Sequence, residues 1–264
     1  MTTGTRPPVL CYHRVGGPLE LGVTRVARSV FARHMTARAH AGWQTLTLAE
    51  FAARLESGNS ALRTPHSEFL VTFDDGYASL AEHAYPILTD LGFTAATFLI
   101  TDYVGRLNTW DVRYTWQRLA HLDWPAIERW RARGLEFASH GATHRRLTWL
   151  DEARAADELG RSRAVLVDRL GPEAGRAVAY PFGARDRRIE QLARAAGYDL
   201  GFGGVRGGRN GTTLGLSRVP VYAWDTGSVP LGLREDGLGA LGRWVAHAAN
   251  RCAIGTSWML ALSR

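Results

Sequence analysis

The chain contains no lysine, so all 32 of its basic residues are arginine. Together with abundant alanine and glycine, this bias indicates a GC-rich genome rather than a surface selected to bind phosphate. The arginines are dispersed, and no basic run alternates with stacking aromatic residues. We therefore expect no nucleic-acid partner, and the net charge of +7 fits an anionic polymer or a membrane surface better.

Cysteine is also scarce, and long apolar runs are absent. Only Cys11 and Cys252 occur, far apart, which excludes a zinc knuckle or a disulfide framework and favours a reducing compartment. Residues 1–8 have no apolar core of signal-peptide length, and no stretch is apolar enough to span a bilayer. We expect a cytoplasmic protein without a transmembrane segment, although a chain trimmed of an export signal would look the same.

Short apolar runs alternate with helical patterns along the 264 residues, of which 45% are hydrophobic. This alternation predicts one α/β domain over residues 1–264, with parallel strands covered by helices. The predicted strands are Val9–Tyr12, Phe69–Phe73, Ala95–Ile100, Leu135–Ala138, Ala177–Tyr180 and Leu216–Tyr222. The predicted helices are Ser29 to about Gly42, Thr47 (with a Glu50 capping box) to about Gly58, a helix ending at Leu91, Asp151–Leu170, Arg187–Ala196 and Arg234–Cys252.

Polar signatures follow four of these strands directly. The carboxyl ends of parallel barrel strands share one rim, where catalytic residues gather. The pattern therefore predicts a functional site at this rim. The four signatures are Tyr12-His13, Asp74-Asp75, Ser139-His140 and Tyr180-Pro181-Phe182-Gly183.

The adjacent carboxylates Asp74 and Asp75 are suited to two different roles. Side chains of successive strand residues point in different directions, so one carboxylate can bind a metal while the other transfers a proton. The alternative is a helix N-cap before the pattern that follows Gly76. Capping needs only one aspartate, so we favour the functional interpretation.

His140 and His144 lie four residues apart, and Gly141 allows a tight turn between them. Such a pair can reach one ion, although alone it is a weak signal. Adding Asp75 gives three N/O ligands and leaves room for water on a divalent cation. Apart from His13, the remaining histidines have no second candidate ligand at a suitable spacing, and we interpret them as surface or packing residues: His34, His40, His66, His83, His121 and His247.

The segments TFDDG, SHGATH and AYPFG, in this order, resemble the polysaccharide deacetylase family (carbohydrate esterase family 4). The resemblance extends over residues 8–225 and leaves a C-terminal helical segment, 234–264, outside it. It includes PVLCYHRV, GWQTLTLAEF and ELGRSRAVLVDRLG. It is strongest to the branch whose barrel begins with a Tyr-His strand, as in deacetylases of poly-N-acetylglucosamine.

This resemblance implies a distorted (β/α) barrel of about seven parallel strands. It also implies hydrolysis of acetyl groups, N-acetyl above all, on an amino-sugar polysaccharide, oligosaccharide or glycoconjugate. Asp74 would be the catalytic base, and Asp75, His140 and His144 would hold one divalent metal ion. The expected ion is Zn²⁺, with Co²⁺, Ni²⁺, Fe²⁺ or Mn²⁺ as alternatives.

The sequence departs from the family pattern in two places. The arginine that opens the third motif and steadies the base is replaced by Ala179, and Arg218 or Arg14 is the candidate substitute. The C-terminal Leu-x-Leu-x-His strand that holds the general acid has no counterpart. Residues 9–13 have its character, and the first and last strands of a barrel are neighbours. We therefore predict His13 as the acid, with a structural histidine at the rim as the alternative.

The third motif also predicts substrate contacts. Tyr180, Pro181 and Phe182 would form the groove wall, and by family analogy the Phe182 backbone N–H would face the developing oxyanion. Trp110 and Phe182 could stack on sugar rings, although a core position is the alternative for any single tryptophan.

Two other functions stay open at this stage. The chain could be a degenerate family member that binds glycan without turnover, an alternative motivated by Ala179. It could also be an amidase of a small acylated amino sugar or metabolite. An open groove would favour a polymer, and a closed pocket would favour a small molecule.

Overall fold

The computed structural model describes residues 6–18, 22–56, 67–110, 118–204 and 212–233. The predicted helix Arg234–Cys252 lies outside these ranges, as do His66 and His247. Within them, no helix is both long enough and apolar enough to cross a bilayer.

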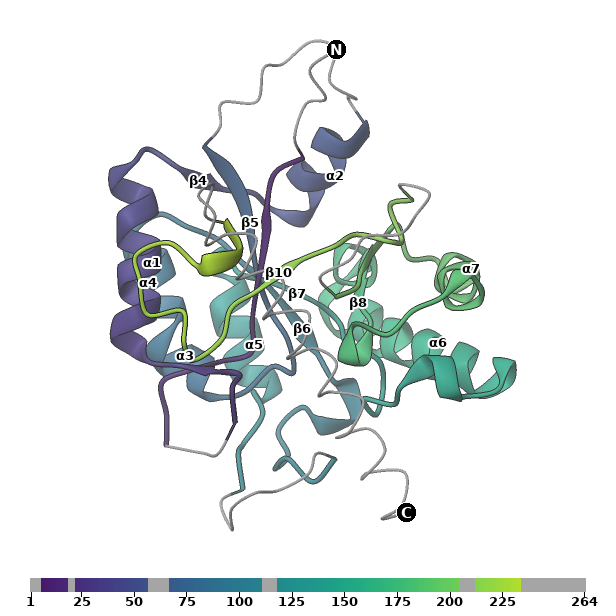
Figure 1. Cartoon of the computed structure of the whole chain (residues 1–264). Coiled ribbons are helices and arrows are strands. Elements are labelled where there is room, and N and C mark those ends of the chain that lie inside the picture. The colour runs from purple at the N-terminus through teal and green to yellow at the C-terminus, as the bar shows by residue number, and fades with distance from the viewer. Residues whose placement is uncertain (1–5, 19–21, 57–66, 111–117, 205–211, 234–264) are drawn as a thin grey trace, which may run out of the picture.

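Seven parallel strands form a curled half-barrel in the order β10-β1-β5-β6-β7-β8-β9, with β4 beside β5 (Figure 1). The predicted fold class, a distorted α/β barrel of about seven strands, is confirmed. A separate parallel pair, β2 with β3, precedes the first helix. The strands are β1 Val9–Tyr12, β2 Arg14–Val15, β3 Arg25–Val26, β4 Gln44–Thr45, β5 Glu68–Phe73, β6 Ala96–Leu99, β7 Glu136–Ser139, β8 Ala177–Ala179, β9 Leu200–Phe202 and β10 Val219–Pro220.

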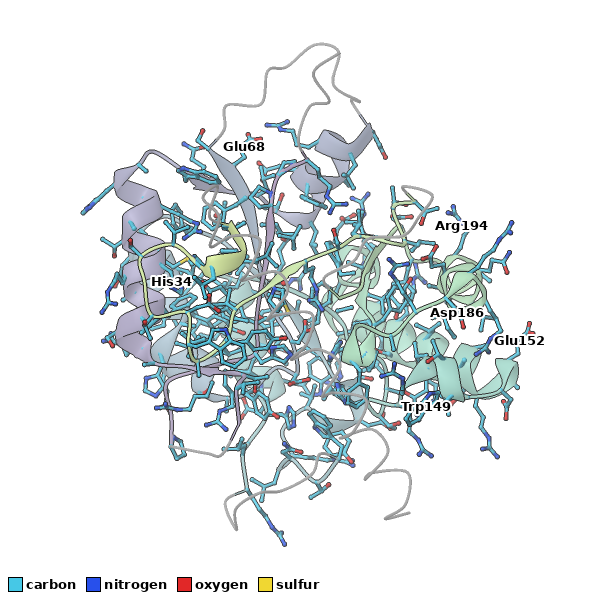
Figure 2. The ribbon with its side chains drawn as sticks, in the orientation of Figure 1. His34, Glu68, Trp149, Glu152, Asp186 and Arg194 are labelled. Carbon is cyan, nitrogen blue, oxygen red and sulfur yellow. The ribbon has the colours of Figure 1, made fainter. Side chains whose placement is uncertain are left out.

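Helices cover the outside of this sheet, as Figure 1 shows. Exposed charged side chains such as Glu152 and Arg194 lie on the outer surfaces of α6 and α7 (Figure 2). The α-helices are α1 Arg28–His40, α2 Leu48–Glu56, α3 Ser79–His83, α4 Tyr85–Asp90, α5 Trp124–Arg131, α6 Glu152–Leu170 and α7 Arg187–Ala195. The 3₁₀ turns are η1 Thr101–Tyr103, η2 Leu147–Trp149, η3 Pro172–Gly175, η4 Pro181–Gly183 and η5 Leu231–Leu233.

Both faces of the sheet are buried, as expected of parallel strands between helices and a barrel interior. Alternate side chains of one strand join different clusters: Tyr12 packs with the outer helices, whereas Val9 packs inside the barrel. The interior cluster includes Phe51 of α2, whose ring lies 6.0 Å from that of Phe202. His34 of α1 (labelled in Figure 2), predicted to be a surface or packing residue, is buried with its Nδ1 3.0 Å from the Tyr12 hydroxyl.

The predicted helix starts and ends are only partly correct. The capping box is confirmed, because the Thr47 N–H donates to Glu50 Oε2 (2.8 Å) and the Glu50 N–H donates to Thr47 Oγ1 (3.1 Å). The predicted Ser29 cap is wrong: Ala27 precedes the helix in an extended conformation, and its carbonyl accepts the first intrahelical bonds. The helix predicted to reach Leu91 is two helices, because Pro86 has no N–H to continue the first one.

The late strand predicted over Leu216–Tyr222 is shorter than expected, because this stretch is shared between two neighbours. Its first part hydrogen-bonds to β9: the Leu216 N–H donates to the Gly201 carbonyl (2.8 Å). Only Val219–Pro220 pairs with β1, and the Val221 N–H then donates to the Cys11 carbonyl (2.8 Å). Residues 213–221, here called the closing segment, therefore pass from one edge of the seven-stranded sheet to the other.

Candidate active site

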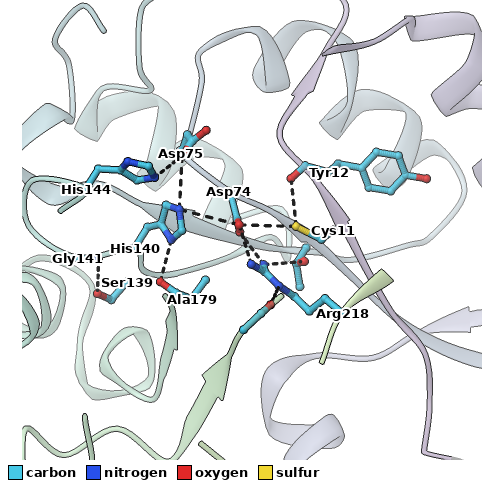
Figure 3. Close-up of polar contacts among 12 residues, drawn as sticks. Cys11, Tyr12, Asp74, Asp75, Ser139, His140, Gly141, His144, Ala179 and Arg218 are labelled. Atoms are coloured by element: carbon cyan, nitrogen blue, oxygen red, sulfur yellow. Dashed lines mark hydrogen bonds and ion pairs between the residues drawn. The ribbon is translucent and has the colours of Figure 1, made fainter. Parts of the chain in front are cut away.

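The predicted site residues gather at the carboxyl ends of neighbouring strands (Figure 3). Asp74 and Asp75 follow β5, His140 follows β7, and His13 follows β1. Both aspartates and His140 are at most 5% exposed, so the site lies below the surface of the rim. Because these parallel strands end at one rim, residues that are up to 127 positions apart in the chain lie close together.

Asp75, His140 and His144 form a compact cluster of candidate metal ligands. Asp75 Oδ1 lies 3.4 Å from His140 Nε2 and 3.4 Å from His144 Nε2, and this oxygen has no hydrogen-bond partner. These separations are too long for charge-assisted hydrogen bonds. They match the spacing of about 3.4 Å between two ligands that each lie about 2.1 Å from a tetrahedral ion. The three residues therefore fit a divalent cation.

The surroundings of the two histidines suit ligand roles. The Nδ1–H of His140 donates to the Ala179 carbonyl (2.8 Å), which orients the ring so that its Nε2 faces Asp75. Burial lowers the pKa of His144 to about 3, despite the opposing effect of Asp75, so this imidazole is neutral. For Asp75, burial opposes ionisation, but the neighbouring histidines outweigh it and hold the pKa of the carboxyl below its usual range.

The backbone at three predicted site residues is bent into the left-handed region. Asp75 (φ 69°), His144 (φ 60°) and Phe182 (φ 60°) are the non-glycine residues with positive φ in the described part of the chain. This conformation is costly for a residue with a side chain, and it persists where the surrounding structure enforces it. Its restriction to these positions indicates that the backbone is held to direct functional groups.

Asp74 is paired with Arg218 of the closing segment. Arg218 Nη1 donates to Asp74 Oδ1 (2.6 Å) and Nη2 donates to Oδ2 (2.7 Å), and both side chains are buried. Burial would raise the pKa of Asp74, but the Arg218 guanidinium outweighs it and holds that pKa well below the usual range. Arg218 thus supplies the positive charge that Ala179 lacks. The other candidate, Arg14, donates to the Pro18 carbonyl (2.7 Å) and lies over the Tyr77 ring.

His13 lies on the Asp74 side of the site. Cys11, His13 and Asp74 each offer an atom within 4.8 Å of the others, and the buried Nδ1 of His13 has no hydrogen-bond partner. The Cys11 thiol donates to Asp74 Oδ2 (3.6 Å), a contact that sequence patterns did not indicate. Burial raises the pKa of Cys11, so its sulfur stays protonated as a donor.

His121, predicted to be a surface or packing residue, contacts the site directly. Its Nδ1–H donates to the Asp75 carbonyl (2.8 Å), and its Nε2 accepts from Trp110 Nε1–H (3.1 Å). The Trp110 ring in turn packs against His144, with centroids 3.8 Å apart. Trp110 is only 3% exposed, so in this conformation it supports a candidate ligand, and sugar stacking on it stays a prediction.

The three residues of the third motif, Tyr180, Pro181 and Phe182, differ in burial and in the groups that they contact. Tyr180 is fully buried, its hydroxyl donates to the Leu214 carbonyl (3.0 Å), and its ring packs in a cluster with Leu159 of α6 and Ile189 of α7. Pro181 is also buried. Phe182 keeps some exposure, and its ring centroid lies 4.7 Å from that of His144. Of the predicted groove wall, Phe182 is therefore the residue whose ring contacts the cluster of candidate metal ligands.

Comparison with known proteins gives consistent matches. The family model described as Polysaccharide deacetylase matches residues 61–201. The putative polysaccharide deacetylase YxkH of Bacillus subtilis (strain 168) is 27% identical over 194 residues, or 74% of this chain. The match spans 63% of that protein's length, which is less than two thirds.

Two solved structures are similar over most of their length. IcaB from Ammonifex degensii has a TM-score of 0.66 at 26% identity, covering 92% of this chain and 98% of that one. The Streptococcus pyogenes deacetylase PplD, solved in complex with acetate, has a TM-score of 0.73 at 21% identity, covering 85% and 96%. At that lower identity the likeness to PplD shows the fold alone.

Proposed function

The chain belongs to the polysaccharide deacetylase family, and from this membership we propose that it is a metal-dependent hydrolase. Its substrate would be an acetylated amino-sugar glycan or glycoconjugate, from which it removes N-acetyl groups. The observation that carries the proposal is the buried cluster of Asp75, His140 and His144 beside an ionised Asp74. All four residues lie within the segment that matches the family model.

Asp75, His140 and His144 would hold the cation, and their N/O donor set suits Zn²⁺, with Co²⁺, Ni²⁺, Fe²⁺ and Mn²⁺ as alternatives. When bound there, a divalent cation lowers the pKa of a coordinated water and polarises the acetyl carbonyl. The protein contributes three further elements: a base, a backbone donor and an acid.

The base is Asp74. Its carboxylate accepts a proton from the attacking water, and the two-point contact with Arg218 fixes the plane of the carboxyl group. The backbone donor is the N–H of Phe182, whose left-handed conformation sets its direction at the rim. This amide would stabilise the oxygen that becomes negative as the acetyl carbonyl is attacked.

The acid is His13. Amide nitrogen is a poor leaving group unless it is protonated, so the C–N bond breaks as the imidazolium of His13 gives its proton to that nitrogen. The products are acetate and a free amine on the sugar. His13 directly follows β1 and offers a ligand atom within 4.8 Å of atoms of Asp74 and Cys11.

The proposal is tested by acetate release from N-acetylglucosamine oligomers and from the monomer. We expect acetate and free amine from the oligomers after loading with Zn²⁺, complete loss of the activity on chelation, and its return on adding Zn²⁺ back. Release from the monomer alone would instead indicate a small-molecule amidase. Activity that is indifferent to chelation would contradict metal dependence.

Replacing His13 with alanine is expected to separate two substrates. N-deacetylation should fall by about 10²-fold or more, because the leaving amine loses its proton donor. Hydrolysis of an activated aryl acetate should change by less than about threefold, since a phenolate leaves without protonation. Steady-state rates on both substrates check this. Equal losses on the two would show that His13 has a structural or base-orienting role.

A further inference from the structure

Glu158, in the middle of α6, is a buried carboxylate that lies against the loop joining His140 and His144. Only 6% of the residue is exposed. Its Oε2 accepts hydrogen bonds from the backbone N–H groups of Ala142 (3.1 Å) and Thr143 (2.9 Å), and its Oε1 accepts from the Thr143 hydroxyl. All of these donors belong to the two residues immediately before His144.

The backbone N–H groups of the loop provide the hydrogen bonds that the buried Glu158 carboxylate needs. A carboxylate taken out of water must be fully hydrogen-bonded, and successive backbone N–H groups that converge on one oxygen form a small anion-binding cradle. In this protein the group bound in the cradle is the side chain of Glu158 rather than a separate anion. Because the cradle is the loop itself, Glu158 fixes the path of the backbone that leads into His144.

A second contact from the same helix anchors the start of the loop. Ser162, one helical turn after Glu158, lies with its Oγ 2.7 Å from the Oγ of Ser139, the residue before His140. The Ser139 Oγ also accepts from the Gly141 N–H (3.1 Å; Figure 3). Helix α6 is thus bonded to both ends of the turn that separates the two histidines.

The helix itself is well placed to act as a rigid support. It has 19 residues, its N-terminus is capped by Asp151, and Leu159 and Leu166 are fully buried. The Tyr198 hydroxyl donates to the Leu159 carbonyl (3.0 Å), which ties the helix to the neighbouring α7 region. His144, by contrast, has the costly left-handed backbone (φ 60°) and must be held in place from outside.

We infer that Glu158 is a positioning residue, which holds the loop so that His144 Nε2 faces Asp75 and a cation can bind between them. This inference rests on the proposed metal-dependent function. It assigns to α6 a role in metal affinity, although no atom of the helix belongs to the ligand cluster.

The experiment is a Zn²⁺ titration of the full chain in competition with a chelator of known affinity. For Glu158→Ala we expect zinc affinity to fall by about 10–100-fold, the usual range for losing a partner that orients a metal ligand. Glu158→Gln should lose about threefold or less, because the amide oxygen still accepts both N–H groups. Glu152→Ala, an exposed glutamate on the same helix (Figure 2), is the matched control and should bind zinc like the wild type.

A second readout uses the metal-free protein. Hydrogen exchange at the Ala142 and Thr143 amides should be slow in the wild type and in Glu158→Gln, and fast in Glu158→Ala. If Glu158→Ala does not fold, Glu158→Asp serves instead: it keeps the charge but retracts the carboxylate by one methylene, and the same loss of zinc affinity is expected.

The outcomes separate this inference from the proposed function. Zinc affinity that is unchanged in Glu158→Ala, with a wild type that binds zinc, would overturn the positioning role alone. Failure of the wild type to bind any of the divalent ions would overturn the metal-dependent function, and the positioning role with it.

Discussion

Replacing Asp75 with alanine is expected to abolish metal binding, whereas replacing Asp74 with asparagine should leave the metal bound and remove turnover. Asp75 supplies an unpartnered oxygen midway between two histidines, and without it only two ligands remain. Asparagine at position 74 keeps the shape of the side chain but cannot accept a proton, so kcat should fall by about 10²–10⁴-fold. Metal per chain, by elemental analysis after loading, and acetate release measure the two effects.

A matched control is Asp199→Ala, which removes an exposed aspartate that pairs with Arg176 far from the ligand cluster. It should retain both metal and activity. Equal loss of metal in the Asp74 and Asp75 variants would contradict the division of roles. It would indicate that the two carboxylates bind the cation together.

Replacing Arg218 with methionine is the second change with a large expected effect. It leaves the Asp74 carboxylate buried without its guanidinium partner. Breaking a buried ion pair from one side typically costs about 3–5 kcal/mol of folding stability. We therefore expect a loss of stability of this size in denaturant unfolding, together with a kcat lowered by about 10²-fold or more at neutral pH.

The pH dependence of the Arg218 variant follows from the direction of the pKa shift. Burial favours the neutral acid at Asp74, and Arg218 now outweighs it and holds the pKa of the carboxyl far below its usual value. The pair therefore stabilises the folded wild type above the unfolded pKa of aspartate, about 3.9, and this contribution is lost as pH falls through the lower folded pKa. Without Arg218 the pKa of Asp74 rises, so the acidic limb of the pH–kcat/KM profile should move to higher pH.

Arg54 provides a control with the same chemistry outside the site. It makes a two-point contact with Glu68 (2.9 and 2.8 Å), but both side chains are partly exposed. Arg54→Met should cost at most about 1 kcal/mol and leave the pH profile unchanged. Arg218→Lys should fall between methionine and wild type, because a lysine cannot reproduce the planar two-point contact. An unshifted profile in Arg218→Met would refute the electrostatic role.

Local patterns were sufficient to predict, to within one residue, where the four strands that precede the motifs end. The run Phe69–Phe73 predicted a buried strand, and the structure extends it by one residue to Glu68–Phe73. Because parallel strands end on one rim, the relative placement of Asp75 and His140 also followed from the sequence. The capping box at Thr47 was also predictable, because its two partners, Thr47 and Glu50, lie within four residues of each other in the sequence.

Contacts that depend on packing between distant segments could not be predicted in this way. Arg218 was one of two candidates, because 144 positions separate it from Asp74 and no spacing rule connects them. His121 lies in a segment without a recognisable motif. Glu158 opens ELGRSRAVLVDRLG, which resembles the family but indicated no role for this glutamate. The contacts of both residues depend on which backbone groups the fold places beside them. Sequence patterns therefore indicated the candidate ligands and the base, but not most of the groups that orient them.

The position of Arg218 within the closing segment links the proposed base, Asp74, to the integrity of the fold. The candidate metal ligands lie in the part of the chain that matches the family model, residues 61–201, whereas Arg218 lies where residues 213–221 pass from β9 to β1. If the closing segment separated from β1, the Arg218 guanidinium would move away from Asp74. Burial would then favour the neutral form of Asp74. In the proposed mechanism, closing the barrel would therefore also keep the base ionised, whereas metal binding would depend on other residues.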